Sequence, residues 1–212
     1  MLKQSISDSD GIPHIDGVEG IESITTNSIP AKKVNLLHVL LVTETWLPEV
    51  NGVAMSLGQL MHQLNLKGHN ISLLRPKPNH NSALSNSSES YFQVMQDISH
   101  DLQVKGMSIP KYKELQFGAP VYFKIKKHFQ QLQPDVVHIA TEGPLGLAAL
   151  WAAKTLNITV TTGYHTQFHD FSRHFGLGIL ARPMMAYFKW FHNTSQATCV
   201  PSQKTFQDLD VL

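Results

Sequence analysis

Cysteine is almost missing from this sequence of 212 residues. Cys199 is the only one, so no disulfide can form within the chain. Disulfides are typical of secreted proteins, and their absence fits a reducing, cytoplasmic location. Cys199 lies in the apolar stretch ATCV. Because apolar surroundings favour an unreactive thiol, we expect Cys199 to be buried and structural rather than nucleophilic.

An excess of positive charge is also missing. Lys and Arg together number 17 against 16 Asp and Glu, which gives a formal net charge of +1 at pH 7. A surface that follows the phosphates of a nucleic acid needs a clear basic excess. The charge balance therefore argues against nucleic acid as a partner.

Long apolar runs are missing as well. No stretch approaches the ~20 residues that span a bilayer. The N-terminal residues contain no continuous apolar core of the kind that signal peptides carry. Residues 1–33 are instead rich in Ser, Thr, Asp, Gly and Pro, which predicts a disordered N-terminal tail.

From residue 34 onward, short apolar runs alternate with amphipathic segments. This alternation predicts an α/β fold with a Rossmann-like, doubly wound parallel sheet. The expected strands are residues 36–42, 71–74, 136–140, 158–162 and 197–202, with weaker candidates at 91–95 and 102–107 around a polar excursion over 77–101. The expected helices begin near Val53, Val121, Pro144 and Pro183, with a last helix that Ser202 could cap.

Three of the expected strands end in loops with many polar side chains: TETWLPEVNG, TEG at 141–143 and YHT at 164–166. In an open α/β sheet, ligands bind beyond the carboxyl ends of the strands. The three loops should therefore bring polar side chains to one rim. Glu44 and Glu49 could be solvated loop residues, whereas Glu142 is confined between a strand and a helix that starts with Pro144.

Asn51-Gly52 leaves two interpretations open. The dipeptide is common in plain tight turns. A glycine at the mouth of a helix also lets a ligand approach the backbone, where free N–H groups can bind phosphate. No G-x-G-x-x-G is present, so the sequence lacks the usual dinucleotide-binding fingerprint.

The segment YHTQFHDFSRH raises the question of a metal site. His165, His169 and His174 could converge, but the sequence has no H-E-x-x-H, and Asp170 is the only acid in the segment. Structural histidines fit His169 and His174 better than His165, which directly follows a strand end. We therefore predict no metal.

The segment PMMAYFKWFHN, residues 183–193, also has two interpretations. Its Met, Phe and Trp side chains beside Lys189 could form a helix that lies on a membrane surface. The same apolar side chains could belong to a helix packed on the core. The sequence alone leaves both open.

Four segments resemble the N-terminal half of retaining glycosyltransferases of family 4: TETWLPEVNGVAMSL, PDVVHIATEGPLGLAAL, TTGYHTQFHDFSRHFGLG and CVPSQKTFQDL. The nearest subgroup is that of GDP-mannose-dependent α-mannosyltransferases and of sulfoquinovosyl- or glucosyl-diacylglycerol synthases. The resemblance runs from about residue 34 to the end and is weakest over 77–101. It implies the GT-B fold, in which two Rossmann-like domains enclose the active site.

The resemblance also implies roles for individual residues. His165 would be catalytic at the reacting centre, and Asn51 and Gly52 would bind the donor. Thr141, Glu142 and Thr166 would line the acceptor side. The family needs no obligatory metal, and we expect no cofactor.

The implied activity is transfer of a hexose, with retention of configuration, from a nucleotide sugar to a lipid or glycan acceptor. GDP-mannose is the first candidate donor and a UDP-sugar the second, with peripheral contact to the inner face of the membrane as a further expectation. Residues 34–212 would form the acceptor-side domain, incomplete at its C-terminus and inactive without the donor-binding domain. The alternatives are a non-catalytic acceptor- or membrane-binding module and a histidine-ligated metallohydrolase.

Overall fold

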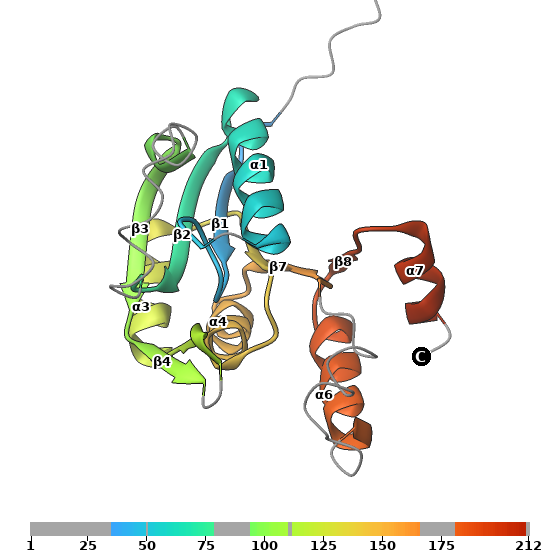
Figure 1. Cartoon of the computed structure of the whole chain (residues 1–212). Coiled ribbons are helices and arrows are strands. Elements are labelled where there is room, and N and C mark those ends of the chain that lie inside the picture. Colours follow the sequence, from blue (N-terminus) through green and yellow to red (C-terminus); the bar gives the residue numbers. More distant parts are fainter. Residues whose placement is uncertain (1–34, 50, 79–93, 110–111, 166–180, 211–212) are drawn as a thin grey trace, which may run out of the picture. The chain divides into compact units, whose positions relative to one another are not determined.

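The computed structural model describes residues 35–49, 51–78, 94–109, 112–165 and 181–210 (Figure 1). These residues belong to one unit, which starts at Asn35. The predicted tail over 1–33 lies outside the described residues and stays a prediction.

The predicted parallel sheet is confirmed. Six strands lie in the order β3-β2-β1-β6-β7-β8, and each neighbouring pair from β3 to β8 is parallel. Chain order reverses between β1 and β6, which is where open α/β sheets bind ligands. The strand bounds are β1 His38–Val42, β2 Asn70–Pro76, β3 Ile98–Val104, β6 Val136–Ile139, β7 Thr159–Gly163 and β8 Ala197–Cys199.

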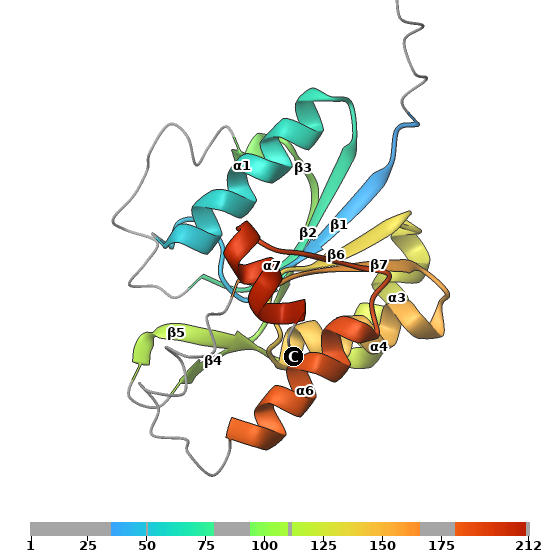
Figure 2. The same ribbon diagram turned by 90° about the vertical axis from the view of Figure 1, so that its right-hand side faces the viewer.

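Helices cover both faces of the sheet (Figure 2). Helix α1, Gly52–Leu66, lies on one face, and α3, Tyr122–Leu132, and α4, Pro144–Thr155, lie on the other. Alternate residues of β1 point to opposite faces, as the pleat requires. Leu40 and Val42 join the core with α3 and α4, whereas Val39 and Leu41 join the core with α1.

Local signals in the sequence explain where the helices begin and end. Asn51 caps α1 by accepting a hydrogen bond from the Ala54 N–H at 2.9 Å. Gly68 follows α1 with a φ of 88°, a left-handed conformation that glycine adopts easily. Pro144 occupies the first turn of α4. Ser202 accepts from the Thr205 N–H at 3.1 Å, which confirms the predicted cap of α7, Gln203–Asp210.

The weak strand predictions between β2 and α3 are wrong in detail. Residues 94 and 95 of the predicted strand 91–95 belong to a helical turn over 94–96, and 91–93 lie outside the described residues. The predicted strand 102–107 is divided at Lys105 between β3 and β4, Gly106–Ile109. Strand β4 leaves the main sheet and pairs antiparallel with β5, Tyr112–Gly118, a hairpin that the sequence pattern did not reveal.

The C-terminal elements correct one prediction and bear on another. Cys199 is exposed, not buried, because β8 is the edge strand and alternate residues on it face away from the sheet. Helix α6, Ala181–Asn193, packs its buried Phe191 and partly buried Tyr187 against the core, as the core-helix interpretation expects. Among the described residues, no helix combines the length and apolarity needed to cross a bilayer.

Candidate functional site

The loop after β1 is held in place by hydrogen bonds among its own side chains. Thr45 donates through Oγ1 to the Glu49 carboxylate at 2.6 Å, and its oxygen accepts from the Asn51 amide at 2.6 Å. Thr43, which is fully buried, donates to the Thr45 carbonyl at 2.7 Å. The polar residues of this loop therefore fix its conformation and deliver Asn51 to the N-terminus of α1.

An open groove lies beside this N-terminus, with a volume of about 540 Å³. That volume is within the range of small-molecule sites. The residues that line it are Thr45, Asn51, Gly52, Val53, Ser56, His165 and Pro201. The structure thus brings the predicted donor-binding residues Asn51 and Gly52 to the same groove as the predicted catalytic residue His165.

The N-terminus of α1 gives the groove its hydrogen-bond donors. The first N–H groups of a helix have no acceptor within the helix, and Asn51 already occupies that of Ala54. The N–H groups of Gly52 and Val53 remain at the mouth of the helix, where its dipole favours an anion. A Cβ added to Gly52 would meet no atom within 4 Å, so the space beside this residue is open.

His165 follows the end of β7, and its ring lies over Gly163. A Cβ on Gly163 would come within 2.6 Å of His165 Nε2 and 3.4 Å of His138 Nε2. Any larger residue at 163 would therefore displace the His165 ring. His138, on β6, is in turn hydrogen-bonded through Nδ1 to Thr161 Oγ1 at 2.9 Å.

Burial keeps both of these rings neutral near pH 7. Burial, together with the neighbouring His165, lowers the pKa of His138 to about 4. Burial also lowers the pKa of His165. The Glu142 carboxylate raises this pKa, but its effect is the smaller of the two. A neutral His165 ring can donate one hydrogen bond and accept another at the groove.

Glu44 is not a solvated loop residue, contrary to one sequence interpretation. Its side chain is 7% exposed and accepts a hydrogen bond from the Leu145 N–H, at the start of α4, at 2.8 Å. The Glu44 N–H donates to Thr141 Oγ1 at 3.0 Å. Gly143 leaves room for the carboxylate, which a Cβ there would overlap. Glu44 therefore ties the loop after β1 to the loop after β6.

Burial raises the pKa of Glu44 to about 8. The N–H groups of Leu145 and Gly146 oppose this shift, while the negative charge of Glu142 adds to it. Glu49 is also more buried than a solvated residue would be, and burial raises its pKa against the hydrogen bond from Thr45. Two acids of the loop after β1 thus belong to its internal structure.

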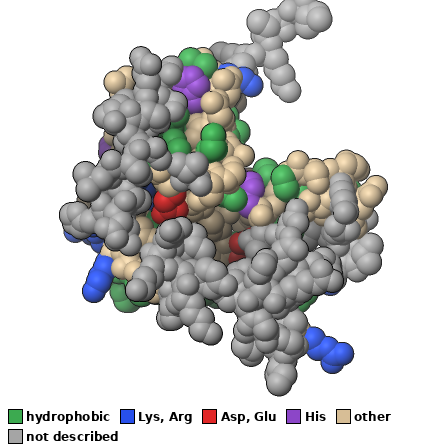
Figure 3. All heavy atoms as spheres, viewed as in Figure 1, with side chains coloured by type: hydrophobic (Ala, Val, Ile, Leu, Met, Phe, Trp, Pro, Cys, Tyr) green, Lys and Arg blue, Asp and Glu red, His purple; other side chains and the backbone are tan. Residues whose placement is uncertain are grey.

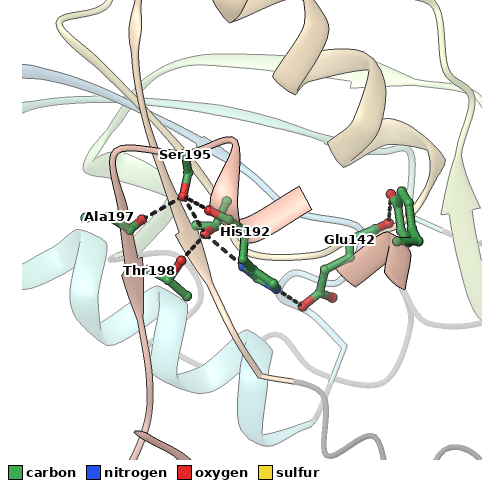
Figure 4. A network of polar contacts seen from close by, with 7 residues as sticks. Glu142, His192, Ser195, Ala197 and Thr198 are labelled. Carbon is green, nitrogen blue, oxygen red and sulfur yellow. Dashed lines mark hydrogen bonds and ion pairs between the residues drawn. The ribbon is translucent and has the colours of Figure 1, made fainter. Parts of the chain in front are cut away.

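Glu142 is buried and paired with α6, as Figure 4 shows. Its Oε1 lies 3.2 Å from His192 Nε2, and the other ring nitrogen of His192 lies 2.9 Å from Thr162 Oγ1. The Thr162 hydroxyl continues the network to Thr198 Oγ1 at 3.0 Å and to Ser195 Oγ at 3.1 Å. Glu142 therefore lies at one end of a polar network that reaches from the loop after β6 to β8.

The backbone at Glu142 is fixed by the same helix. The Tyr187 hydroxyl, on α6, donates to the Glu142 carbonyl oxygen at 2.6 Å. Burial raises the pKa of Tyr187 above its usual value, so this hydroxyl keeps its proton. Of the predicted acceptor residues, Thr141 and Glu142 are thus held by neighbours, and Thr166 lies outside the described residues.

Sequence reasoning missed the residues that support this site: Glu44 as a cap, Gly163 as space for a ring, His138, and Tyr187 and His192 on α6. The contact partners of Glu142 on α6 are 45 and 50 residues away along the chain. Only the position of Glu44 and Gly163 at strand ends could have drawn attention to them.

No metal centre is found among the described residues, where no group of three or more His, Cys, Asp or Glu side chains could hold an ion. Of the candidate ligands, His169, His174 and Asp170 lie outside these residues. His165 itself is close to His138 and to the charge of Glu142.

Cations are scarce at the groove. Within the described part of the chain, no Lys or Arg lines it. In Figure 3 the Lys and Arg side chains of the described residues lie mainly at the edges of the view. Among the described residues, an anionic ligand in the groove would therefore be bound by the backbone N–H groups of α1 rather than by a charged side chain.

Comparison with known proteins assigns this arrangement to a family. The chain matches the family described as Glycosyltransferase Family 4 over residues 50–211. It is 28% identical to a GDP-mannose-dependent alpha-mannosyltransferase of Mycobacterium tuberculosis, over 82% of this chain and 44% of the relative. It is 27% identical to an alpha-monoglucosyldiacylglycerol synthase of Streptococcus pneumoniae, over 79% of this chain and 36% of that protein.

The chain thus spans less than half the length of these relatives. Among solved structures, a Listeria monocytogenes protein assigned as a UDP-N-acetylglucosamine 2-epimerase shares the fold, with a TM-score of 0.53. The identity is 12%, and the match covers 84% of this chain and 43% of the other. This likeness supports the Rossmann-like fold and nothing about the reaction.

Proposed function

Because the chain belongs to Glycosyltransferase Family 4, we propose that it forms the acceptor-side domain of a retaining hexosyltransferase that uses a nucleotide-activated sugar. One observation carries the proposal: the groove in which the open N-terminus of α1 faces the same space as His165. A diphosphate and the sugar attached to it need these two features side by side.

In this proposal the N-terminus of α1 binds the diphosphate of the donor. Breaking the bond between the sugar and the diphosphate leaves negative charge on the diphosphate, and N–H groups already oriented toward that charge stabilise the transition state. Gly52 lets the phosphates approach these N–H groups without a Cβ between them. Further cations for the diphosphate would come from a second, donor-binding domain.

His165 would contact the transferred sugar. A neutral ring can donate a hydrogen bond to a sugar hydroxyl and fix the orientation of the sugar relative to the acceptor. Its place over Gly163 restricts the ring to one side of the strand end. Thr141, Glu142 and Thr166 would form the acceptor side next to it.

We favour attack by the acceptor on the same face from which the diphosphate leaves, without a covalent intermediate on the protein. A double displacement would need a carboxylate free to attack the sugar. Glu44 caps α4 and Glu142 is paired with His192, so both of these acids already have partners. Mass spectrometry that found a glycosyl group bonded to Glu142 or Asp170 would overturn this preference.

For the sugar and the acceptor, the relatives supply the first candidates. The M. tuberculosis relative uses GDP-mannose, and the S. pneumoniae relative makes a glucosylated diacylglycerol, as their names state. We propose mannose from GDP-mannose as the first donor to test, a UDP-sugar as the second, and a lipid or a glycan as the acceptor. A cytoplasmic location with peripheral contact to the inner membrane face would fit a lipid acceptor.

The decisive experiment is a transfer assay with the full-length protein, offered GDP-mannose and a panel of UDP-sugars with lipid and glycan acceptors. We expect transfer from one nucleotide sugar, undiminished by EDTA, and an NMR spectrum of the product that shows the anomeric configuration of the donor. An inverted product would refute the retaining mechanism. Acceptor or vesicle binding without transfer from any donor would favour the non-catalytic binding module instead.

A further inference from the structure

His192 occupies a position that the proposed reaction does not yet explain. It is buried on α6, and its ring contacts two separate parts of the site. On one side its Nε2 lies 3.2 Å from the Glu142 carboxylate, in the loop after β6. On the other side its Nδ1 lies 2.9 Å from Thr162 Oγ1, on β7.

Two contacts of His192 lie just before His165 along the chain. Thr162 lies three residues before His165, and Tyr164, the residue directly before it, packs edge-on against the His192 ring with centroids 5.4 Å apart. Glu142, the ion-pair partner of His192, is close enough for its charge to act on His165. One imidazole thus joins the acceptor loop to the strand end that carries His165.

We propose that His192 is a positioning residue, which holds the Glu142 carboxylate toward His165 and fixes the segment from Thr162 to His165. This inference rests on the proposed function for its kinetic consequences only. His192 has no place among the residues that line the groove, so it acts through Glu142 and Thr162 rather than by touching a substrate.

The chemistry of the network supports a directional role. A carboxylate accepts but cannot donate, so His192 must present Nε2–H to Glu142. In the neutral ring, Nδ1 then accepts from the Thr162 hydroxyl, which in turn accepts from Thr198 or Ser195. A buried network of this kind orients its members when every contact is made, and it loses that order when one donor is removed. The donor at Nε2 is therefore the critical atom.

The test compares two substitutions that differ at this atom. His192→Gln retains an N–H that can reach Glu142, whereas His192→Leu fills similar volume without any donor. Glu142→Gln removes the charge itself, and Phe129→Leu alters the same core at α3 without touching the network. The first readout is the pKa of the His165 ring. It is measured by an NMR pH titration of the 212-residue chain with labelled histidines.

Two groups of the described residues act on the His165 ring besides solvent: His138 on β6 and the Glu142 carboxylate. Glu142→Gln should lower the His165 pKa, because the carboxylate raises it. His192→Leu should do the same, because the Glu142 carboxylate then loses the Nε2–H contact that holds it in place. His192→Gln and Phe129→Leu should titrate close to wild type.

The second readout is kinetic and uses the full-length protein. His192→Leu should lower kcat by about 10-fold to 100-fold, the scale of a small misplacement at a reacting centre, with the donor KM near that of wild type. His192→Gln should recover most of the loss. If no hexose transfer is found at all, the proposed function fails, while the NMR titration still decides the role of His192.

Identical His165 titrations in wild type, His192→Leu and Glu142→Gln would overturn the proposal and leave His192 as a core residue. If His192→Leu does not fold, the contrast between His192→Gln and Glu142→Gln still decides. A shift as large in His192→Gln as in Glu142→Gln would show that the N–H donor does not position the carboxylate.

Discussion

The carboxyl edge of the sheet carries two groups of polar residues with opposite surroundings. Asn51, Gly52 and His165 line an open groove. Glu142 and His192 are buried, with exposed fractions of 9% and 8%, and bond to other parts of the chain. Glu142 follows a strand that ends at the same edge as those before Asn51 and His165, so sequence position alone cannot separate it from the groove residues.

The difference between the groups lies in what each side chain can still do. A groove residue has bonding capacity left for a ligand, whereas a buried residue has already used its capacity to hold loops together. Changes in the groove should therefore affect binding and turnover more than stability, and changes in the buried group should do the reverse.

The largest loss of stability should come from Glu142→Ala, which would break the buried pair. Removing the carboxylate leaves the buried His192 N–H without this acceptor and its network incomplete, at a cost of up to about 3 kcal/mol in unfolding free energy. Urea unfolding of the chain at pH 7 measures it. Glu142→Gln, which keeps an oxygen acceptor for His192, is the control and should lose less. A loss below about 1 kcal/mol in Glu142→Ala would mean that the pair does not hold the loop.

The groove side of the comparison is tested by His165→Ala. Losing a positioned polar group at the reacting centre should lower kcat in the full-length enzyme by about 10²-fold or more, which corresponds to about 2.7 kcal/mol. The melting temperature should change little, because the ring is only half buried.

His62→Ala is the matched control for His165→Ala. His62 lies on α1 and pairs with Asp97 at 2.6 Å, outside the groove, so its removal should leave kcat unchanged. Equal turnover of His165→Ala and wild type at saturating donor and acceptor would end the catalytic assignment. A large loss of melting temperature with unchanged turnover would make His165 structural.

The elements that position the groove could be predicted from the sequence because their signals are local. The apolar run of β1, the cap at Asn51 and Pro144 at the start of α4 each act within a few residues. Rules for parallel sheets then place the three strand-end loops at one edge. Their convergence on a groove with His165 follows from chain topology, not from contacts between particular side chains.

The buried group could not be predicted in this way. Glu44 caps a helix that begins 100 residues later, and His192 meets Glu142 across 50 residues. The local sequence predicts whether a residue type prefers water. It does not show which distant residue will bond to an acid and so make its burial favourable. The same limit explains Cys199, whose apolar neighbours suggested burial although its strand lies at the edge.

Glu44→Gln tests whether Glu44 belongs with the buried group. Its pKa is raised from 4.5 to about 8, so the folded chain holds a proton that the unfolded chain releases between these values. The contribution of Glu44 to stability is therefore most favourable below about pH 4.5 and declines as pH rises through 8. Gln keeps the acceptor for the Leu145 N–H and does not titrate.

Relative to wild type, Glu44→Gln should gain roughly 3 to 4 kcal/mol of unfolding free energy between pH 5 and pH 8. Urea titrations of both proteins at pH 5 and pH 8 measure how the stability difference between them changes with pH. Asp135→Asn serves as a control at the opposite end of β1, where its carboxylate accepts from the His38 N–H in an exposed position. A difference between the two proteins that stays constant from pH 5 to pH 8 would show that the carboxylate of Glu44 is charged when folded.

The smallest effect on the fold should come from Gly52→Ala, which therefore gives the sharpest contrast with the buried group. No atom lies within 4 Å of the added Cβ, and α1 begins at this residue. Alanine restricts the unfolded chain more than glycine does, so stability should stay equal or rise by up to about 1 kcal/mol.

In the full-length enzyme the methyl group of Gly52→Ala would instead stand between the helix N-terminus and the donor diphosphate. The donor KM should then rise about 3-fold to 10-fold with a smaller change in kcat, since the contact exists before the reaction as well as during it. Gln59→Ala, on an exposed part of the same helix outside the groove, should leave the donor KM unchanged. An unchanged donor KM in Gly52→Ala would remove the diphosphate from the N-terminus of α1 while leaving the assignment of His165 to be judged by its own substitution.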